Sequence, residues 1–380
     1  MQDFVVRRAY HNNRVIGILT VILFLCFLLK IAANWAMLRS SISTCRAVIL
    51  LLLLFLSYVL FRVLHTLLHE LGHILFGKMM GFRLTSVQLN RYLFAPGKRT
   101  IHNLGRENIR YLTSMRPGEK DKAYKYVIYS LGGCLITAIA LLCISAAGIL
   151  KEPGTPGIMI KYIFFYEGTV SIIRNIVPNY HGEYGNDGFN AYCLGRYQAM
   201  RQSYYYQCIL YRDFLSGKSP YNVTLGTDVI DAIKDNYNIY SYYPSVYLYY
   251  KCIDSNRLKE AEECLKMIKE HETIFGQQTI SKIRLEELYY RCMAEKDFQI
   301  TKEELDRLKA MAQKGSIEVI RVYHAICKYV LRDYHTSMEY EREVKKVIPD
   351  YMQGLYHFQQ RLIMKSDLYK QRFAALNAEQ

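Results

Sequence analysis

The sequence predicts an all-α protein, with a polytopic bundle of about four transmembrane helices followed by a cytoplasmic array of solenoid-like helical repeats. Four long apolar stretches lie in the first half of the 380 residues. After Asp187 no stretch is apolar enough to span a bilayer, and the composition becomes rich in Tyr, Lys and Glu. We therefore expect a membrane domain in residues 1–196 and a helical-repeat domain in residues 197–380.

The apolar stretches cover residues 15–35, 47–76, 127–150 and 158–177. Each is close to or above the roughly 20 residues that a helix needs to cross a bilayer. The first is long and has no small-residue cleavage site, so we expect an anchor rather than a removable signal peptide. The fourth is the least apolar, because it contains Lys161, Glu167 and Arg174.

Basic residues are concentrated beside these stretches, and the net charge is +15. Arg7, Arg8 and Arg14 precede the first stretch, and many Arg and Lys residues lie between positions 78 and 125. The positive-inside rule makes both segments cytoplasmic, so four spans leave both termini in the cytoplasm. We expect an integral protein of a bacterial cell membrane. The charge is explained by topology and by attraction to anionic lipid, and no motif predicts a nucleic-acid partner.

Ten cysteines are present, without a CxxC pair or zinc-finger spacing. In a reducing cytoplasm they are expected to be free thiols. Cys26, Cys134 and Cys143 fall within apolar stretches, where we expect them to pack as small apolar side chains.

The strongest functional signal is the motif His69-Glu70-Leu71-Gly72-His73, at the end of the second apolar stretch. Residues four apart share one face of a helix, so the two imidazoles can hold one Zn²⁺ while Glu70 acts as the general base of a peptidase. His65, one turn earlier, is a candidate supporting donor or proton carrier, or it lines a polar cavity. The alternative for the whole motif is a set of polar residues that end a membrane helix at the headgroup level.

Catalytic zinc needs three protein ligands and an open fourth position. The candidates for the third ligand are His181, Glu183 and Asp187, which follow the fourth apolar stretch in a segment with Gly and Pro. Irregular backbone at membrane depth is tolerated where it lines a cavity, so this segment predicts a cleft.

At this point the chain resembles the site-2 protease family of intramembrane zinc metalloproteases, over about residues 50–197. The resemblance rests on His69-Glu70-Leu71-Gly72-His73 with Gly81 downstream, on the Ser130 to Gly133 opening of the third stretch, and on Asn175-x-x-Pro178 leading to Asn186-Asp187-Gly188. It implies that His69, His73 and Asp187 are the zinc ligands and that Glu70 is the general base. It also implies that Asn175 contacts the substrate backbone.

Two features depart from the family pattern. The spacing from Asn-x-x-Pro to Asp-Gly is longer here by residues 180–185, which leaves His181 or Glu183 as competitors for the metal. There is also no room for the PDZ domain that many members insert.

The functional hypothesis is therefore an intramembrane zinc endopeptidase that cleaves a membrane protein or a membrane-associated peptide. Two alternatives remain: an inactive binding or chaperone-like protein of the same fold, and a membrane-anchored solenoid adaptor.

Two further segments predict local structure: a hairpin after the second apolar stretch and helical repeats in the tail. Alternating residues at 85–90 and 110–114, with a Pro96-Gly97 turn, predict a hairpin that can hold an extended substrate strand, or else an irregular basic loop. In the tail, segments at 249–252, 289–292 and 325–328 recur every 35 to 40 residues, and residues 258–265 resemble a tetratricopeptide helix. Such an array presents a docking surface for a protein partner, or its tyrosines simply pack together.

Overall fold

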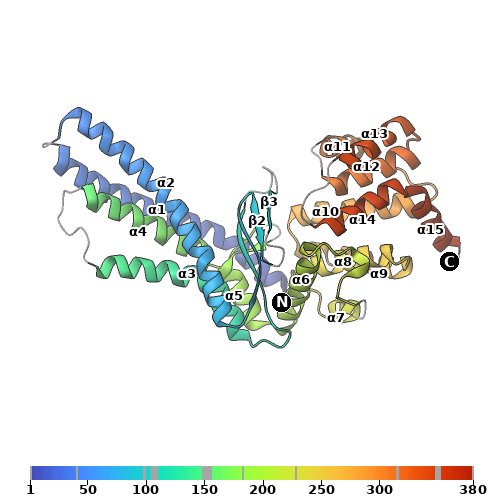
Figure 1. The fold of residues 1–380 in the computed structure, drawn as a ribbon, viewed down its shortest axis with the longest axis horizontal. Helices are drawn as coiled ribbons and strands as arrows, with labels where there is room; N and C mark the ends of the chain where they lie inside the picture. The colour runs from blue at the N-terminus through green and yellow to red at the C-terminus, as the bar shows by residue number, and fades with distance from the viewer. Residues whose placement is uncertain are drawn as a thin grey trace. The chain divides into compact units, whose positions relative to one another are not determined.

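The structure, a computed structural model, describes residues 2–39, 42–96, 100–103, 110–147, 156–181, 184–226, 229–313, 316–346 and 352–378. Within them the chain is mostly helical, which agrees with the all-α class. It divides into two compact units (Figure 1): unit 1 comprises Met1–Asn90 and Arg110–Gln198, and unit 2 comprises Arg91–Ile109 and Ala199–Gln380.

Unit 1 contains α1 (Gln2–Arg39), α2 (Thr44–Met79), α3 (Ala123–Ala146), α4 (Pro156–Ile176) and α5 (Asp187–Arg196). Among the described residues, three helices are long and apolar enough to cross a membrane: Arg14–Arg39 within α1, Thr44–Met79 and Ala123–Ala146. The fourth predicted span forms a helix, α4, but it is not one of these three because its sequence is less apolar.

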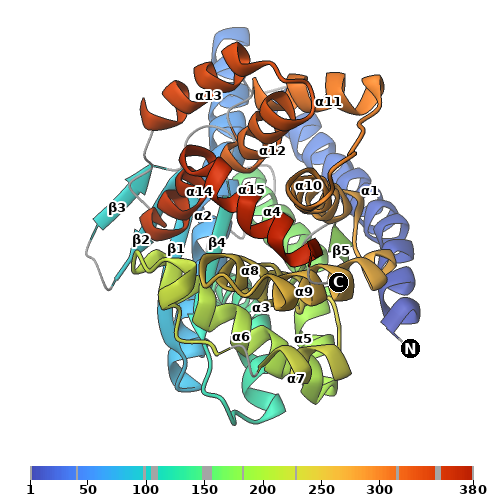
Figure 2. The ribbon, with the colours of Figure 1, turned by 90° about the vertical axis from the view of Figure 1, so that its right-hand side faces the viewer.

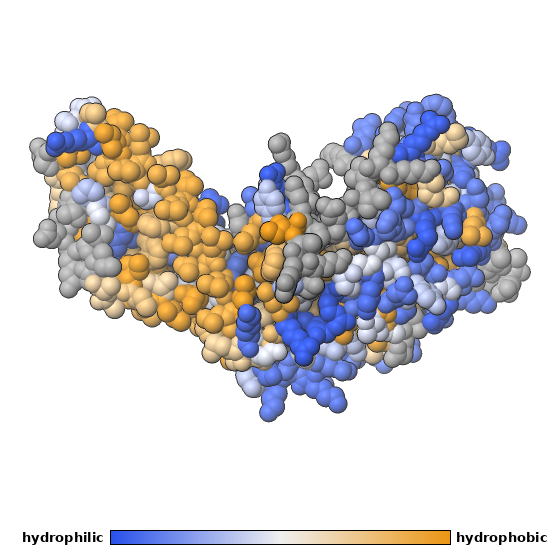
Figure 3. Space-filling model, viewed as in Figure 1, coloured by the Kyte–Doolittle hydropathy of each residue, from blue (hydrophilic) through white to orange (hydrophobic). Residues whose placement is uncertain are grey.

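The apolar side chains of these helices are turned outward. In α2, Leu52, Phe55 and Leu56 are each more than 60% exposed, and Figure 3 shows a continuous apolar surface over the helices of unit 1. A soluble protein rarely exposes so large an apolar area, whereas lipid solvates it. The surface supports membrane association.

Helices α2, α3 and α4 pack against one another inside unit 1. Leu50 and Leu54 of α2 meet Met159 and Ile163 of α4 in a buried cluster that partly buried side chains of α1 cover. At Gly72 and Gly132 the backbones of α2 and α3 touch, since a Cβ at Gly132 would lie 2.8 Å from the Gly72 carbonyl oxygen. Small residues permit such close crossings in membranes.

The loop between α2 and α3 contains strands, so the hairpin alternative is the one that the structure shows. In unit 1, β1 (Arg83–Asn90) pairs antiparallel with β4 (Arg110–Arg116), with Val87 opposite Thr113. In unit 2, β2 (Tyr92–Ala95) pairs antiparallel with β3 (Thr100–Asn103). Within the inserted segment, β5 (Tyr180–His181) pairs antiparallel with β6 (Tyr184–Gly185). These strands are additions to the all-α prediction.

Unit 2 is helical after its hairpin (Figure 2). Its helices are α6 (Gln198–Leu215), α7 (Val229–Asp235), α8 (Tyr242–Asp254), α9 (Leu258–Glu270), α10 (Gln277–Ala294), α11 (Lys302–Ala312), α12 (Ile317–Tyr329), α13 (Tyr334–Lys346), α14 (Gln353–Met364) and α15 (Ser366–Ala378), with single-turn 3-10 helices η2 (Pro220–Asn222) and η3 (Glu272–Ile274).

The three recurring tail segments fall in α8, α10 and α12. Helix α8 packs on α9, α10 packs on α12 and α15, and α12 packs on α13 and α14. A regular repeat solenoid is therefore not confirmed. Tyr249, Tyr250 and Tyr289 are buried, so these tyrosines pack in the interior, and a docking surface for a partner stays a prediction.

A buried ion pair joins α12 to α10, and α8 contributes a hydrogen bond to the same carboxylate. Arg321 of α12, with no exposed surface, donates from Nη2 to both Glu286 carboxylate oxygens of α10 at 2.6 Å. The Tyr250 hydroxyl of α8 donates to Glu286 at 2.6 Å, and the guanidinium lies 4.2 Å from the Tyr289 ring centroid. Glu286 therefore receives hydrogen bonds from both neighbouring helices.

A second buried carboxylate, Asp213 in α6, binds the segment that follows this helix. It accepts a hydrogen bond from the Thr224 backbone N–H at 2.6 Å and pairs with Arg212 at 2.6 Å. Burial raises the pKa of Asp213, but the bonds from Thr224 and Arg212 outweigh burial and hold the pKa below its usual value.

Candidate metal centre

Helix α2 brings two imidazoles of the motif together. His69 and His73 are four residues apart on one face, as the helical period requires. Their Nε2 atoms lie 3.2 Å apart, and both side chains are buried, at 8% and 7% exposure.

The first turn of α5 carries Asp187, and Asn186 sets its position. As the N-cap residue, Asn186 accepts hydrogen bonds at Oδ1 from the backbone N–H groups of Phe189 (3.0 Å) and Asn179 (2.9 Å). Its side-chain amide donates to the carbonyls of Arg174 and Val177, both at 2.7 Å. The start of α5 is thereby fastened to the end of α4.

Gly188 allows the same close approach. A Cβ at this position would lie 2.6 Å from the Ile176 carbonyl carbon, a distance that packed atoms do not adopt. The absence of a side chain therefore lets α5 begin directly against α4, with the Asp187 carboxylate directed at α2.

Asp187 completes a triangle of donor atoms with the two imidazoles. Its Oδ2 lies 2.8 Å from His69 Nε2 and 3.4 Å from His73 Nε2. Zinc binds such atoms at about 2.0–2.2 Å in a tetrahedral arrangement, which separates ligand atoms by about 3.3 Å. The three separations, from 2.8 to 3.4 Å, place the donor atoms close enough together to share one metal ion.

The tautomer of His73 also fits a metal ligand. Its Nδ1 lies 2.9 Å from the Tyr129 carbonyl oxygen of α3. A carbonyl can only accept, so Nδ1 carries a proton, and in the neutral imidazole Nε2 then presents a lone pair. That lone pair faces the His69 imidazole and the Asp187 carboxylate, an arrangement that a cation would stabilise.

The carboxylate of Asp187 is charged in this setting. Burial alone would raise its pKa, but the His73 and His69 imidazoles beside the carboxylate outweigh burial and lower the pKa to about 2. An ionised carboxylate is the form that binds a metal.

Gly133 of α3 shapes the pocket of His69. A Cβ at this position would lie 2.6 Å from His69 Nε2 and 2.5 Å from Nδ1. The His69 ring therefore rests directly on the α3 backbone. Its Nδ1 is buried and has no hydrogen-bond partner among the residues that the structure describes.

Glu70 lies beside the triangle without being part of it. Its side chain is 7% exposed, and its Oε2 is buried and has no hydrogen-bond partner within the described part of the chain. Glu70 and His73, three residues apart, are neighbours on the helix surface. The Thr113 hydroxyl of β4 donates to the Glu70 backbone carbonyl at 3.3 Å, so strand β4 borders the motif.

Cys134 is a donor at this centre that we did not anticipate from the sequence. Its Sγ, one donor atom of His69 and one of Asp187 all lie within 4.8 Å of one another. We had expected it to pack as an apolar side chain. The preceding Gly132 and Gly133 indicate a close helix crossing, but such a pattern does not specify which neighbouring side chain points toward the other helix.

The remaining sequence candidates lie outside this cluster or outside the described residues. The Asn175 amide donates to the Ser171 carbonyl of its own helix at 3.0 Å, so its contact with substrate stays a prediction. The His181 side chain and all of Glu183 lie outside the part of the chain that the structure describes, so their competition for the metal also stays open.

His65 and Glu167 connect helices. His65 Nε2 donates to the Phe164 carbonyl of α4 at 3.0 Å, so this imidazole bonds to α4 rather than to the donor triangle. Glu167, 9% exposed, lies near the charges of Arg62 and Arg174 and bonds to Tyr58. Glu167 is therefore held by Tyr58, with two basic side chains nearby.

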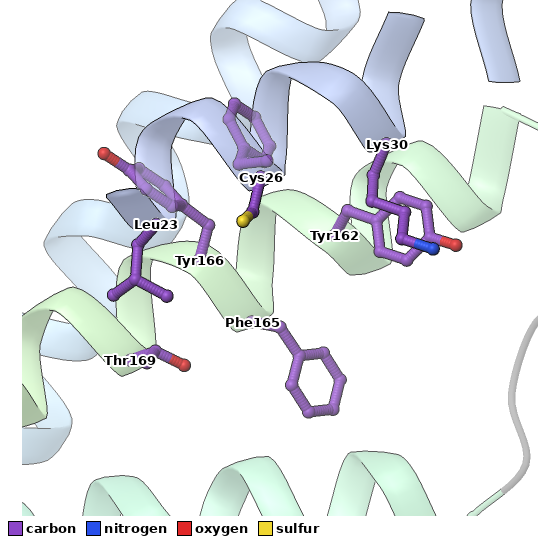
Figure 4. Close-up of a pocket in the computed structure, with 8 residues that line it drawn as sticks. Leu23, Cys26, Lys30, Tyr162, Phe165, Tyr166 and Thr169 are labelled. Carbon is purple, nitrogen blue, oxygen red and sulfur yellow. The ribbon is translucent and has the colours of Figure 1, made fainter. Parts of the chain in front are cut away.

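A separate groove lies between α1 and α4. It has a volume of about 190 Å³ and is lined by Leu23, Cys26 and Lys30 of α1 and by Tyr162, Phe165, Tyr166 and Thr169 of α4. Figure 4 shows these side chains on the two helices. It shares no residue with the donor triangle, so the metal centre and the groove are distinct features.

No family model, curated protein or solved structure matches this chain. The functional assignment therefore rests on the residues and geometry of the chain itself.

Proposed function

We propose that this protein is an intramembrane zinc endopeptidase that hydrolyses a peptide bond in, or close to, the membrane. The observation that carries the proposal is the meeting of His69 Nε2, His73 Nε2 and Asp187 Oδ2 within 3.4 Å of one another. Glu70 lies between them in sequence, and its buried Oε2 has no hydrogen-bond partner among the described residues. Two imidazoles, one carboxylate and a nearby glutamate are the donor set and base of a hydrolytic zinc site.

Each residue has a separate role in this proposal. His69, His73 and Asp187 would hold the ion, and the Tyr129 carbonyl keeps the His73 tautomer correct. When bound, Zn²⁺ supplies the Lewis acidity that activates water and polarises the substrate carbonyl. Glu70 takes the proton of the attacking water and delivers it to the leaving amine, which restores the carboxylate.

The surroundings suit a substrate that arrives in an extended form. A peptide bond inside a membrane helix is hydrogen-bonded and shielded from water, so cleavage requires local unwinding. Strand β4 borders Glu70 through Thr113, and a strand can take up an unwound segment through main-chain hydrogen bonds. We therefore propose a membrane protein or membrane-associated peptide as the substrate.

The proposal is tested by separating metal binding from turnover. Purified wild type should contain about one Zn²⁺ per chain, and His73→Ala should contain much less, because two donors hold the ion poorly. Glu70→Gln should keep the zinc, since the carboxamide has a similar shape and Glu70 is not a ligand. It should lose hydrolysis, because an amide cannot accept the proton at neutral pH.

Substrates are sought by comparing membrane proteomes of cells with wild type, Glu70→Gln and the exposed control Glu119→Gln. One or more precursors should accumulate in the Glu70→Gln cells alone. Identical proteomes, with zinc retained in all three proteins, would reject the peptidase and favour a protein that binds membrane segments without cutting them. Equal zinc in His73→Ala and wild type would reject the metal centre itself.

A further inference from the structure

Cys134 lies inside the centre that the proposed peptidase uses. It is on α3, 4% exposed, and follows the two glycines that bring α3 against α2. Its sulfur, one donor atom of His69 and one of Asp187 all lie within 4.8 Å of one another. An apolar side chain would pack equally well here, but a thiol adds a donor atom that such a side chain lacks.

The chemistry of the site leaves a place for this donor. Two imidazoles and one carboxylate supply three of the four ligands that zinc takes in a tetrahedral site. Thiolate sulfur is a soft donor that zinc and cobalt bind well, whereas magnesium and calcium prefer oxygen. Asp187 Oδ2, one of these donor atoms, is buried and has no hydrogen-bond partner among the residues that the structure describes, which is a second sign that the centre holds an ion.

We infer that Cys134 is a further metal ligand, which completes a four-donor set with His69, His73 and Asp187. This inference rests on the proposed metal centre and deepens it. When the sulfur binds, its lone pair forms the bond to the metal and the thiol proton leaves to solvent; when it dissociates, the bond breaks and the thiol takes up a proton again. Four protein donors would make a closed, resting centre, so the sulfur would have to leave the ion to open a position for water. Rotation about the Cα–Cβ bond provides that movement.

Cobalt substitution tests the inference without relying on activity. Full-length protein in detergent is stripped of metal and loaded with Co²⁺ as wild type, Cys134→Ser and the control Cys143→Ser, whose thiol is exposed on the same helix. Wild type and Cys143→Ser should show the intense near-ultraviolet absorption of a cobalt–thiolate bond. Cys134→Ser should lose that absorption while keeping the weaker visible bands of bound cobalt.

The outcomes separate the inference from the proposed function. One cobalt per wild-type chain without thiolate absorption overturns the role of Cys134 and leaves the three-ligand centre intact. Thiolate absorption that persists in Cys134→Ser also overturns it, because the sulfur then comes from another cysteine. Cobalt that fails to bind wild type stoichiometrically overturns the metal centre, and with it both ideas. If Cys134→Ser does not fold, X-ray absorption of the wild-type cobalt protein decides, since a sulfur neighbour at about 2.3 Å is required.

Discussion

Gly133→Ala tests the metal centre through a residue that itself binds nothing. The added Cβ would lie 2.6 Å from His69 Nε2, which is 0.8 Å short of the 3.4 Å at which ordinary contact begins. The α3 backbone is held against α2 at Gly132 and Gly72, so we expect the imidazole to yield rather than the helix. His69 Nε2 would then move by nearly 1 Å from Asp187 and His73.

A displacement of this size should weaken zinc binding strongly. Changes to groups that position a ligand typically cost about 10- to 100-fold in metal affinity, which corresponds to about 1.4–2.8 kcal/mol. We expect Gly133→Ala to bind zinc about that much more weakly than wild type. The assay is competition with a chelator of known affinity on the detergent-solubilised protein, with helix content followed by circular dichroism.

Gly17→Ala is the matched control. Gly17 lies in α1, and nothing lies within 4 Å of its added Cβ. The same chemical change in an open helix position should leave zinc affinity unchanged and favour the helix by up to about 1 kcal/mol. If Gly133→Ala folds and binds zinc as tightly as wild type, His69 is not a ligand in the geometry described above.

Three further predictions concern unit 2 and the topology. Glu286→Gln leaves Arg321 buried without its counter-charge and should destabilise the protein to denaturant by about 3–5 kcal/mol, whereas the exposed control Glu295→Gln should cost under about 1 kcal/mol; equal effects would contradict the buried pair. The pKa of Asp213 is lower in the folded than in the unfolded protein, so its charged carboxylate stabilises the fold at pH values above the pKa of the unfolded protein. This stabilisation is lost as the pH falls through the pKa of the folded protein. The difference in melting temperature between wild type and Asp213→Asn should therefore shrink from pH 7 to pH 3, and a constant difference would argue against it. With four spans, Lys259→Cys in a background without exposed native thiols should resist an impermeant thiol reagent in intact cells, and rapid labelling would reverse the assignment.

The sequence predicted the parts of the site that depend on local periodicity. Residues 69 and 73 share a helix face because the period is 3.6, and no tertiary information is needed for that inference. Asp187 was one of three candidates for the third ligand, and only the family resemblance singled it out, since 114 positions separate it from His73. Its approach to α2 depends on Asn186 and Gly188, and each acts through backbone groups of α4 that hydropathy does not reveal.

Other features of the site could not be predicted from the sequence, because they depend on which turns of neighbouring helices contact one another. The thiol of Cys134 became a donor candidate only when α3 was seen to cross α2 at Gly132 and Gly72, where a pattern of small residues does not specify which neighbour faces the crossing. The contact of His65 with the Phe164 carbonyl is of the same kind. The strands between α2 and α3 were one of two readings, because short alternating segments with many basic residues are also typical of loops.

Helix α4 shows why the number of spans is hard to read from composition. Its charges lower its hydropathy below that of the other three long helices of unit 1. However, α4 packs against α1, α2 and α3, and Glu167 lies beside Arg62 and Arg174 rather than facing lipid. A helix that packs against its neighbours does not need a uniformly apolar surface, and basic side chains nearby lower the cost of a buried carboxyl group. We therefore expect α4 to cross the membrane as the fourth span, which returns the chain to the side of its N-terminus. A three-span protein would instead place unit 2 on the opposite side, so labelling at position 259 decides between the two arrangements.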